Sequence, residues 1–397
     1  MYQSLEFLRP NRLQFVIKDV DLAYVNAVRR IILSEIPNVG FYFDPHDIHR
    51  NDINIKTNTG VLHNEFLAHR ISLIPLCFDE NEIGTFDSSQ YNFVLNKKNT
   101  TASVIHVTSK DIEVFDKEGN AVPSHVREKI FPASHVTKDH ILITKLKPNL
   151  YDTQHGDEID IECVASVNTA KTHSRWSPVS QCSLMNVVDQ SAATHAFDEK
   201  IRGKELTASQ KADMKSRFDA LEVYRNYKRN KYDEPSEFLF TIETECRMRP
   251  TYLFFKALTI LESKLEQFVR HIETNDENVV VQQLGNVDNL FQVAIKNEDH
   301  TLVNTLQSQI LHHEIRLIKR TDAVLTYIGY YQPHPLDQLL YIKLKFKDDT
   351  KRDVDFVREF LTKATKKLIQ DVHKLTIEWI EVSDLRKTDI KEVESFV

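Results

Sequence analysis

The sequence predicts an α+β protein in which one structural module occurs twice. Residues 15–33 (FVIKDVDLAYVNAVRRIIL) and 293–311 (VAIKNEDHTLVNTLQSQIL) are identical at seven of nineteen positions without a gap, Asp21 and Asp299 among them. In each copy a short apolar strand leads to this aspartate, which can cap the helix that follows. Two similar modules in one chain can pair about a pseudo-two-fold axis, as identical subunits do in an isologous dimer.

The elements that follow each copy are of the same kinds and in the same order. A β-rich stretch comes first, at 38–43 in the first copy and at 324–331 in the second. An alternating apolar strand comes later, at 237–245 and 338–346. Each half then has a long amphipathic helix, so we expect one α+β module with the same plan in both halves.

The four helices carry apolar residues at three- and four-residue spacing, which is typical of a helix face buried in a core. The long helices are expected to begin near Pro250, a favoured residue of the first helical turn, and at about Asp353. The expected core of the pseudo-dimer consists of Val25, Val28, Ile32, Leu302, Leu306, Ile310, Phe254, Leu261, Leu361 and Leu368.

A long insertion interrupts the first module, whereas the second is compact. The insertion is mostly strand-like, as in DINIKTNTGV, YNFVLN and HILITKL, and it ends in a helical stretch at 207–231. The expected organisation is a first module in two parts at 1–43 and 226–272, an inserted β-rich domain with a helical end at 44–225, a polar linker at 273–289 and the second module at 290–397.

Composition excludes several classes of protein. The 397 residues suggest two or three domains. Glycine occurs only 8 times, where average usage would give about 28, and there is no glycine-rich phosphate loop, so a Rossmann enzyme or a P-loop NTPase is a poor first choice. A net charge of −7 argues against non-specific coating of DNA. No apolar run approaches the ~18 residues of a membrane span and the N-terminus lacks a signal peptide, so we expect an intracellular protein without membrane contact.

Two clusters suggest alternative functions. His63, Glu65 and His69 could serve a metal-dependent hydrolase, although they miss the H-E-x-x-H spacing that puts both histidines on one helix face. The segment 224–232 (YRNYKRNKY) interleaves tyrosines with basic residues, which is compatible with a nucleic-acid-binding factor. The ordinary interpretations are a helical turn facing the surface and a solvated helix end, respectively.

Two further features suggest contacts with another protein. Trp176 precedes Ser-Pro in KTHSRWSPVS and is either an exposed interface anchor or a residue that packs on its own domain. Arg29 and Arg30 correspond to the uncharged Gln307 and Ser308 of the second copy. We therefore expect the two arginines to point away from the shared core or to run along its rim, and to form a patch specific for a partner. The ordinary interpretation is a solvated helix face.

Three segments of the first half resemble the third-largest subunit of eukaryotic RNA polymerase II and its archaeal counterpart, known as D. They are VNAVRRIILSEIP, VLHNEFLAHRISLIPL and KTHSRWSPV, the last with Arg175 where that family has lysine. In the second half, KNEDHTLVNTLQSQI and GYYQPHPLDQLLYIKL are similar to the small α-like partner of that protein, known in archaea as L. Both families resemble the bacterial α dimerisation fold, which would account for the internal repeat.

The resemblance implies a non-catalytic assembly platform of a DNA-directed RNA polymerase, with no catalytic, cofactor-binding or metal-binding residues of its own. The implied partners are the two largest polymerase subunits and small polymerase subunits, with DNA reached only through the complex. Because the pseudo-dimer forms within one chain, no homo-oligomer is expected. The implied docking residues are Arg29, Arg30, His63, Glu65, His69, Arg70, Lys171, His173, Arg175 and Trp176.

The sequence departs from this family in two ways. Cellular homologues of the larger protein often carry a cysteine cluster that binds zinc or an iron–sulfur cluster, whereas the four cysteines here lie far apart, so no cofactor is expected. The two subunits are also fused, which resembles large DNA viruses of eukaryotes. The expected location is then the viral factory in the host cytoplasm, with packaging in the virion, and for a cellular protein it is the nucleus.

Overall fold

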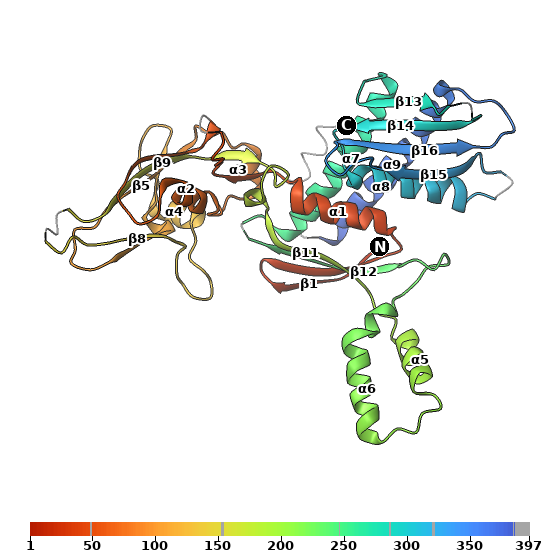
Figure 1. Ribbon diagram of the computed structural model, residues 1–397, viewed down its shortest axis with the longest axis horizontal. Helices are drawn as coiled ribbons and strands as arrows, with labels where there is room; N and C mark the ends of the chain where they lie inside the picture. Colours follow the sequence, from red (N-terminus) through yellow and green to blue (C-terminus); the bar gives the residue numbers. More distant parts are fainter. Residues whose placement is uncertain are drawn as a thin grey trace. The chain divides into compact units, whose positions relative to one another are not determined.

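The structure is a computed structural model, drawn in Figure 1. It describes residues 1–383 and 385, except for 48–49, 152–154, 246, 286 and 320–321. The chain forms two compact units. The paired-module unit comprises 1–32, 181–242 and 253–397, and the insert unit comprises 33–180 and 243–252.

The paired-module unit contains two four-stranded sheets with the same plan. In spatial order the first sheet is β1 (Tyr2–Arg9), β2 (Arg12–Lys18), β12 (Glu237–Thr244) and β11 (Val179–Asn186). The second sheet is β13 (Val279–Gln283), β14 (Leu290–Lys296), β16 (Leu339–Phe346) and β15 (Leu325–Tyr331). Every strand of one sheet therefore has a counterpart at the same place in the other, as expected for a repeated module.

Four helices complete the two modules, and Figure 1 shows them between the two sheets. They are α1 (Leu22–Ser34), α7 (Pro250–Glu273), α8 (His300–Leu311) and α9 (Val354–Val382). The side chain of Asp299 accepts a hydrogen bond from Thr301 N at 2.8 Å and caps α8, while Asp353 caps α9 through Phe356 N at 2.9 Å. Asp21 accepts equivalently from Ala23 N at 2.7 Å at the start of α1.

Strand pairing corrects the predicted counterpart of β15 and the predicted end of the insertion. The counterpart of β15 is β11 rather than residues 38–43, of which 38–40 form β3 (Asn38–Gly40) in the insert unit. The β-rich insertion therefore lies between α1 and β11 in the chain and ends before the predicted 225. Alternation of apolar residues identified the strands but could not reveal which strands pair, because pairing is decided by long-range contacts.

The predicted helical end of the insertion is a separate hairpin between β11 and β12. It consists of α5 (Gln190–Ile201) and α6 (Ala208–Leu221), whose small core contains Ala193, Phe197 and Phe218. Phe218 is buried, whereas Leu221 at the end of α6 is 73% exposed, so the apolar side of this helix is buried only in part.

The linker predicted at 273–289 is wrong for most of its length. Helix α7 continues to Glu273 and β13 begins at Val279, so only residues 274–278 connect the modules. Asp276 accepts from Asn278 N at 2.8 Å within this turn. Val279 and Val281 of β13 are buried, and β13 is an edge strand of the second sheet. The linker was predicted from the polar residues in the first half of 273–289, whereas the valines that follow favour a strand.

Reciprocal contacts between α1 and α8 demonstrate the pseudo-two-fold pairing. The repeat aligns Asp21 with Asp299 and Arg30 with Ser308. Arg30 Nη2 lies 3.7 Å from the Asp299 carboxylate, and Ser308 Oγ donates to Asp21 Oδ1 at 3.3 Å. Each helix thus uses the same position to reach the N-cap of the other, which is the contact pattern of an isologous interface.

The helix faces between the sheets are tightly packed. The ten apolar positions expected in the pseudo-dimer core are each at most 2% exposed in the structure. They are Val25, Val28, Ile32, Leu302, Leu306, Ile310, Phe254, Leu261, Leu361 and Leu368.

Trp379 of α9 joins the two cores. Although α9 belongs to the second module, the indole is fully buried among rings of the first, with centroids 5.0 Å from Tyr2, 4.7 Å from Phe15 and 4.4 Å from Phe254. The Tyr2 hydroxyl also donates to Leu375 O of α9 at 3.2 Å. The two modules therefore share side chains.

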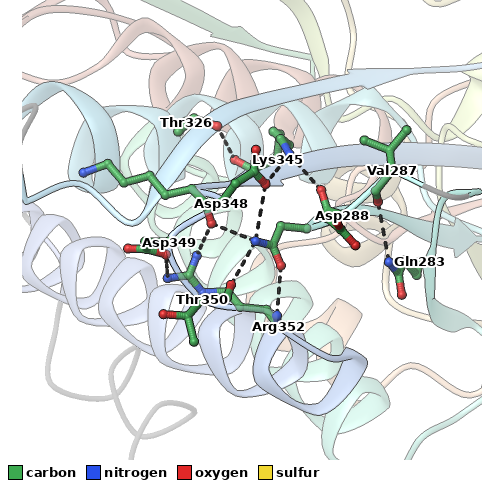
Figure 2. A network of polar contacts seen from close by, with 11 residues as sticks. Gln283, Val287, Asp288, Thr326, Lys345, Asp348, Asp349, Thr350 and Arg352 are labelled. Carbon is green, nitrogen blue, oxygen red and sulfur yellow. Dashed lines mark hydrogen bonds and ion pairs between the residues drawn. The ribbon is translucent and has the colours of Figure 1, made fainter.

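Asn289 anchors the start of α9 to the β13–β14 hairpin through contacts with Thr350 and Arg352, which are labelled in Figure 2. Its buried side-chain amide donates to Lys347 O at 2.8 Å and to Thr350 O at 2.9 Å, and its Oδ1 accepts from Arg352 N at 2.9 Å. Figure 2 also shows Lys345 reaching Asp348, at 2.6 Å. Asn289 has a φ of 53°, in the left-handed region that asparagine tolerates better than most residues.

The insert unit is mostly β, as predicted. Its main sheet has the order β4 (Ile53–Asn58), β9 (Glu158–Val164), β5 (Tyr91–Lys98) and β7 (Glu113–Asp116). Two-stranded ribbons join β6 (Ile105–Thr108) with β8 (Leu142–Leu146), and β3 with β10 (Ser166–Asn168). The helices are α2 (Asn64–Ser72), α3 (Glu80–Gly84) and α4 (Ser124–Ile130).

We expect Trp379→Ala to lower the free energy of unfolding by about 3–5 kcal/mol, because it removes a buried ring from the joint between the two modules. Chemical denaturation monitored by circular dichroism measures the loss. Ile377→Ala is the matched control, since Ile377 lies on the same helix and is 45% exposed. A loss for Trp379→Ala no larger than that of the control would show that the joint does not stabilise the fold.

We expect Asn289→Gly to cost about 1–3 kcal/mol, because glycine accepts the positive φ but removes the buried amide that donates to Lys347 O and Thr350 O and accepts from Arg352 N. Asn289→Ala should cost about 1 kcal/mol more, since it adds strain at the same φ. Equal stability of both variants and wild type in denaturant titrations would refute the anchoring role.

Candidate partner-docking surface

Helix α2 has one buried side and one exposed side. Leu67, Ala68 and Ile71 are buried and hold it on the insert unit. The opposite side carries exposed polar residues, among them His63, which precedes the helix, Glu65 and His69. The three polar residues expected from the sequence to meet a partner are therefore accessible.

An apolar side chain that the sequence analysis missed lies on this exposed side. Phe66 is 60% exposed, and the His63 ring meets it edge-on at 4.7 Å between centroids. Leu73, seven residues further on, is 47% exposed, and Val61 before the helix is 65% exposed. Phe66 and Leu73 are seven residues apart, so they lie on the same side of the helix, and this side differs from the one that carries the buried residues. That spacing could have predicted two exposed apolar side chains from the sequence. We call Val61, His63, Phe66, His69 and Leu73 the α2 face.

Arg70 supports the α2 face from behind. Its guanidinium donates to Ile143 O at 2.9 Å and to Leu142 O at 2.7 Å, both on β8. The side chain thus fixes the helix on the ribbon, because a guanidinium presents several donors in a rigid plane.

The segment 171–176 is held in place by similar bonds. Arg175 donates to Phe41 O at 2.9 Å and to Phe43 O at 3.0 Å, and its Nε donates to His173 Nδ1 at 3.1 Å. Lys171 has an exposed side chain and forms an ion pair with Glu35 at 3.0 Å.

Of the two expectations for Trp176, the exposed interface anchor is wrong. It is fully buried, and its indole N–H donates to Ser166 O at 3.4 Å. A Cβ on Gly40 would lie 2.9 Å from the indole nitrogen, so glycine is needed at that position for the ring to pack. Trp176 therefore packs on its own domain, because a planar ring of this size gains more by filling the core than by facing water.

The two sequence-distant motifs influence each other electrostatically. Partial burial and the positive charges of Arg175 and His69 lower the pKa of His173. His69 of the α2 segment is therefore near enough to His173 to repel its protonated form. The structure brings 63–70 and 171–175 into one region of the insert unit.

Arg29 and Arg30, which we expected to point away from the core or to run along its rim, make different contacts. Arg30 Nε donates to Thr301 Oγ1 at 2.9 Å and its Nη2 meets Asp299, so this side chain crosses the pseudo-dimer seam. Arg29 donates to Asn26 Oδ1 at 3.0 Å on its own helix. The uncharged repeat partner Ser308 makes the corresponding contact, because its hydroxyl reaches the opposite N-cap aspartate where arginine uses a guanidinium.

The alternative clusters are structurally ordinary. Among the described residues no group of three or more His, Cys, Asp or Glu side chains is placed to hold a metal ion, His63, Glu65 and His69 included. In the segment 224–232, Lys228 pairs with Glu237 at 2.9 Å and Arg229 with Asp233 at 2.8 Å, which neutralises much of its charge.

The cysteines whose surroundings are described are not activated nucleophiles. Cys77, Cys163 and Cys182 are buried free thiols. Burial raises the pKa of Cys182 to about 12 and that of Cys163 still further, so both stay protonated at neutral pH. In the described part of the chain, no helix has the length and apolar character needed to cross a bilayer.

Comparison with family models identifies both modules. Residues 14–265 match the model of the RNA polymerase Rpb3/Rpb11 dimerisation domain, and residues 291–378 match a second model with the same description. The two matches cover the two halves of the internal repeat.

Individual relatives are subunits of eukaryotic RNA polymerases. The chain is 27% identical to the DNA-directed RNA polymerase II subunit RPB3 of Schizosaccharomyces pombe over 312 residues, which are 74% of this chain and 94% of that protein. It is 26% identical to the DNA-directed RNA polymerases I and III subunit RPAC1 of Bos taurus over 308 residues, 66% of this chain and 82% of that protein. The human RPAC1 is 25% identical over the same coverage.

We expect Arg30→Ala to destabilise the fold by about 1 kcal/mol, because it removes a part-buried, charge-assisted bond across the α1–α8 seam. Arg29→Ala should change stability by less than about 0.5 kcal/mol, since it loses only a contact within one helix turn. Thermal melts of the two variants test this, and the reverse order of stability would contradict the assignment.

Proposed function

Since the chain belongs to the RNA polymerase Rpb3/Rpb11 dimerisation-domain family, we propose that it is the non-catalytic assembly subunit of a DNA-directed RNA polymerase. It combines in one polypeptide the two modules that form the dimeric platform. The observation that carries this proposal is the reciprocal pairing of α1 with α8, because it makes the two matched domains one interface rather than two independent domains. No step of catalysis is assigned to the chain.

The α2 face is our proposed docking site for a large polymerase subunit. An exposed phenylalanine flanked by two further exposed apolar residues and two histidines has the composition of an interface centre with a polar rim. Arg70 and Arg175 contribute indirectly, because their bonds to backbone carbonyls hold the helix and the neighbouring 171–176 segment in place. Glu65 and Lys171 add exposed charges that can select the partner.

The paired-module unit offers a second contact through Arg29. This side chain is half-exposed and, unlike that of Arg30, donates a hydrogen bond within its own helix. A guanidinium can grip a carboxylate or carbonyls on a partner with two directed bonds. We propose that Arg29 meets the second large subunit and that small polymerase subunits complete the assembly, with DNA bound only through the complex.

The fused arrangement also supports a proposal about the biological setting. The relatives named above are polymerase subunits, whereas this chain contains both matched domains. We propose a viral origin, with transcription in the factory of a large DNA virus in the host cytoplasm and packaging in the virion; the nucleus is the location for a cellular chain.

We expect Phe66→Asp to weaken co-purification of the large subunits at least about tenfold, since it places a charge at the centre of a surface that must lose its water on docking. The tagged chain is co-expressed with the large subunits, and the bound fraction is quantified by mass spectrometry. The thermal melt of the isolated variant should match wild type, because Phe66 is 60% exposed.

Leu221→Asp is the matched control for this experiment. Leu221 is 73% exposed at the end of α6 in the paired-module unit, so the change has the same chemistry on a surface for which no docking is proposed. Unchanged recovery of the large subunits with Phe66→Asp, or equal loss with Leu221→Asp, would overturn the α2 face as the docking site.

A further inference from the structure

A cavity of about 620 Å³ lies at the seam between the modules in the paired-module unit. Its walls come from four places: the β2–α1 turn with Asp21 and Tyr24, the turn before β12 with Tyr232, the end of α8 with Gln309 and His313, and α9 with Asp371. The segment His312–Arg316 is a π-helix, a rare conformation that is frequent at functional sites. We call this space the seam cavity.

Pseudo-symmetry provides an internal comparison. The buried faces of α7 and α9 align Phe268 with Leu375 and hence Lys264 with Asp371, and the repeat aligns Glu298 with Val20. A second cavity lined by Lys264, Phe268 and Glu298 lies at this equivalent position, and its volume is about 270 Å³.

The two cavities differ in one pair of residues. In the smaller cavity the Lys264 ammonium binds the Glu298 carboxylate at 2.8 Å across the space. In the seam cavity the counterpart of the lysine is the acid Asp371, and Val20 replaces the glutamate. The chain therefore supplies its own cation in one cavity and a carboxylate in the other. Only the seam cavity falls within the ~300–1,000 Å³ typical of ligand sites.

Three buried polar atoms that line the seam cavity have no partner within the described part of the chain. They are the Tyr24 hydroxyl, Gln309 Nε2 and His313 Nδ1. Tyr24 and Gln309 are only 5% and 3% exposed. Buried polar groups are nearly always satisfied, so three such atoms in one cavity indicate an occupant that can both donate and accept hydrogen bonds.

The acidic residues that line the seam cavity favour a cation. The Asp371 carboxylate oxygen Oδ2 lies at hydrogen-bond distance, 3.0 Å, from His313 Nε2. Burial, and then the negative charges of Asp371 and Asp21, raise the pKa of Tyr24 well above its ordinary value. The lysines that line the cavity, Lys231 and Lys374, are exposed to solvent. The negative charges that act on the buried Tyr24 hydroxyl therefore come from Asp371, whose side chain is 40% exposed, and from Asp21. The Met1 amino group, which also lines the cavity, lies 3.6 Å from the Glu378 carboxylate.

We propose that the seam cavity is a binding site for an arginine side chain presented by an extended segment of a partner polypeptide. The guanidinium would take the place that the Lys264 ammonium occupies in the equivalent cavity, with Asp371 and the Tyr24 oxygen as acceptors. A backbone carbonyl of the same segment would accept from Gln309 Nε2. Arginine fits better than lysine because its planar guanidinium can donate hydrogen bonds to Asp371 and to the Tyr24 oxygen at the same time. The inference does not depend on the docking role of the α2 face.

The test uses the purified full chain and two neutral-capped probes, N-acetyl-arginine methylamide and its uncharged analogue N-acetyl-citrulline methylamide. Binding is followed by calorimetry up to about 20 mM probe and by the shift of the thermal midpoint. For a Kd of about 1 mM, about 10 mM of the arginine probe should raise the folded-to-unfolded ratio about tenfold, with no rise for the citrulline probe.

Asp371→Asn should weaken the arginine probe at least about tenfold while keeping the size and shape of the side chain. Asp355→Asn is the matched control, because Asp355 lies on the same helix and its carboxylate is 85% exposed. The double variant Val20→Glu with Asp371→Lys introduces the lysine–glutamate pair of the smaller cavity into the seam cavity. It should abolish binding, because the new lysine would occupy the place of the guanidinium. If both probes bind equally, if neither binds at the highest concentration, or if Asp371→Asn binds like wild type, the proposal is overturned and the cavity is filled by water.

Discussion

The indole of Trp379 packs among Tyr2, Phe15 and Phe254, and this contact makes the two modules one body. A tryptophan at the distal end of a 29-residue helix would be exposed to water if the second module folded alone. The α1–α8 seam joins the same two modules through the contacts of Arg30 with Asp299 and of Ser308 with Asp21. Burying apolar surface is the main favourable term for such a fold, so pairing is a condition of stability rather than an addition to it.

The two modules are alike at their buried apolar positions and differ at the polar positions beside them. The buried helix faces are equivalent in both modules, because packing tolerates only residues of similar volume and polarity. The polar positions beside them have diverged: Arg30 and Ser308 make the same reciprocal contact with different groups, and Lys264 and Asp371 carry opposite charges. Both large insertions belong to the first module, where loops between elements can lengthen at little cost in stability.

Local patterns in the sequence predicted the helices, most strands and the repeat, because these depend on spacing and capping within a few residues. They failed where distant segments decide the outcome. Trp176 could not be placed without knowing that Gly40 leaves room for its ring, and the contact of Arg30 with Thr301 could not be foreseen because the two residues are remote in sequence. The strand β13 was hidden behind a polar turn, since its partner β14 is what makes Val279 and Val281 a buried face. Phe66 escaped notice because an exposed apolar side chain looks like a core residue in sequence.

The short connection of residues 274–278 has a consequence for synthesis in the cell. Two separate subunits must find each other by diffusion, and an excess of either leaves apolar helix faces open to aggregation. A tether of this length keeps the second module at a local concentration in the millimolar range, where an encounter between separate chains would depend on expression level. The ratio of the two modules is one by construction, and a single messenger RNA delivers both at the same place and time. Dilution can separate a heterodimer, but it cannot separate these two halves.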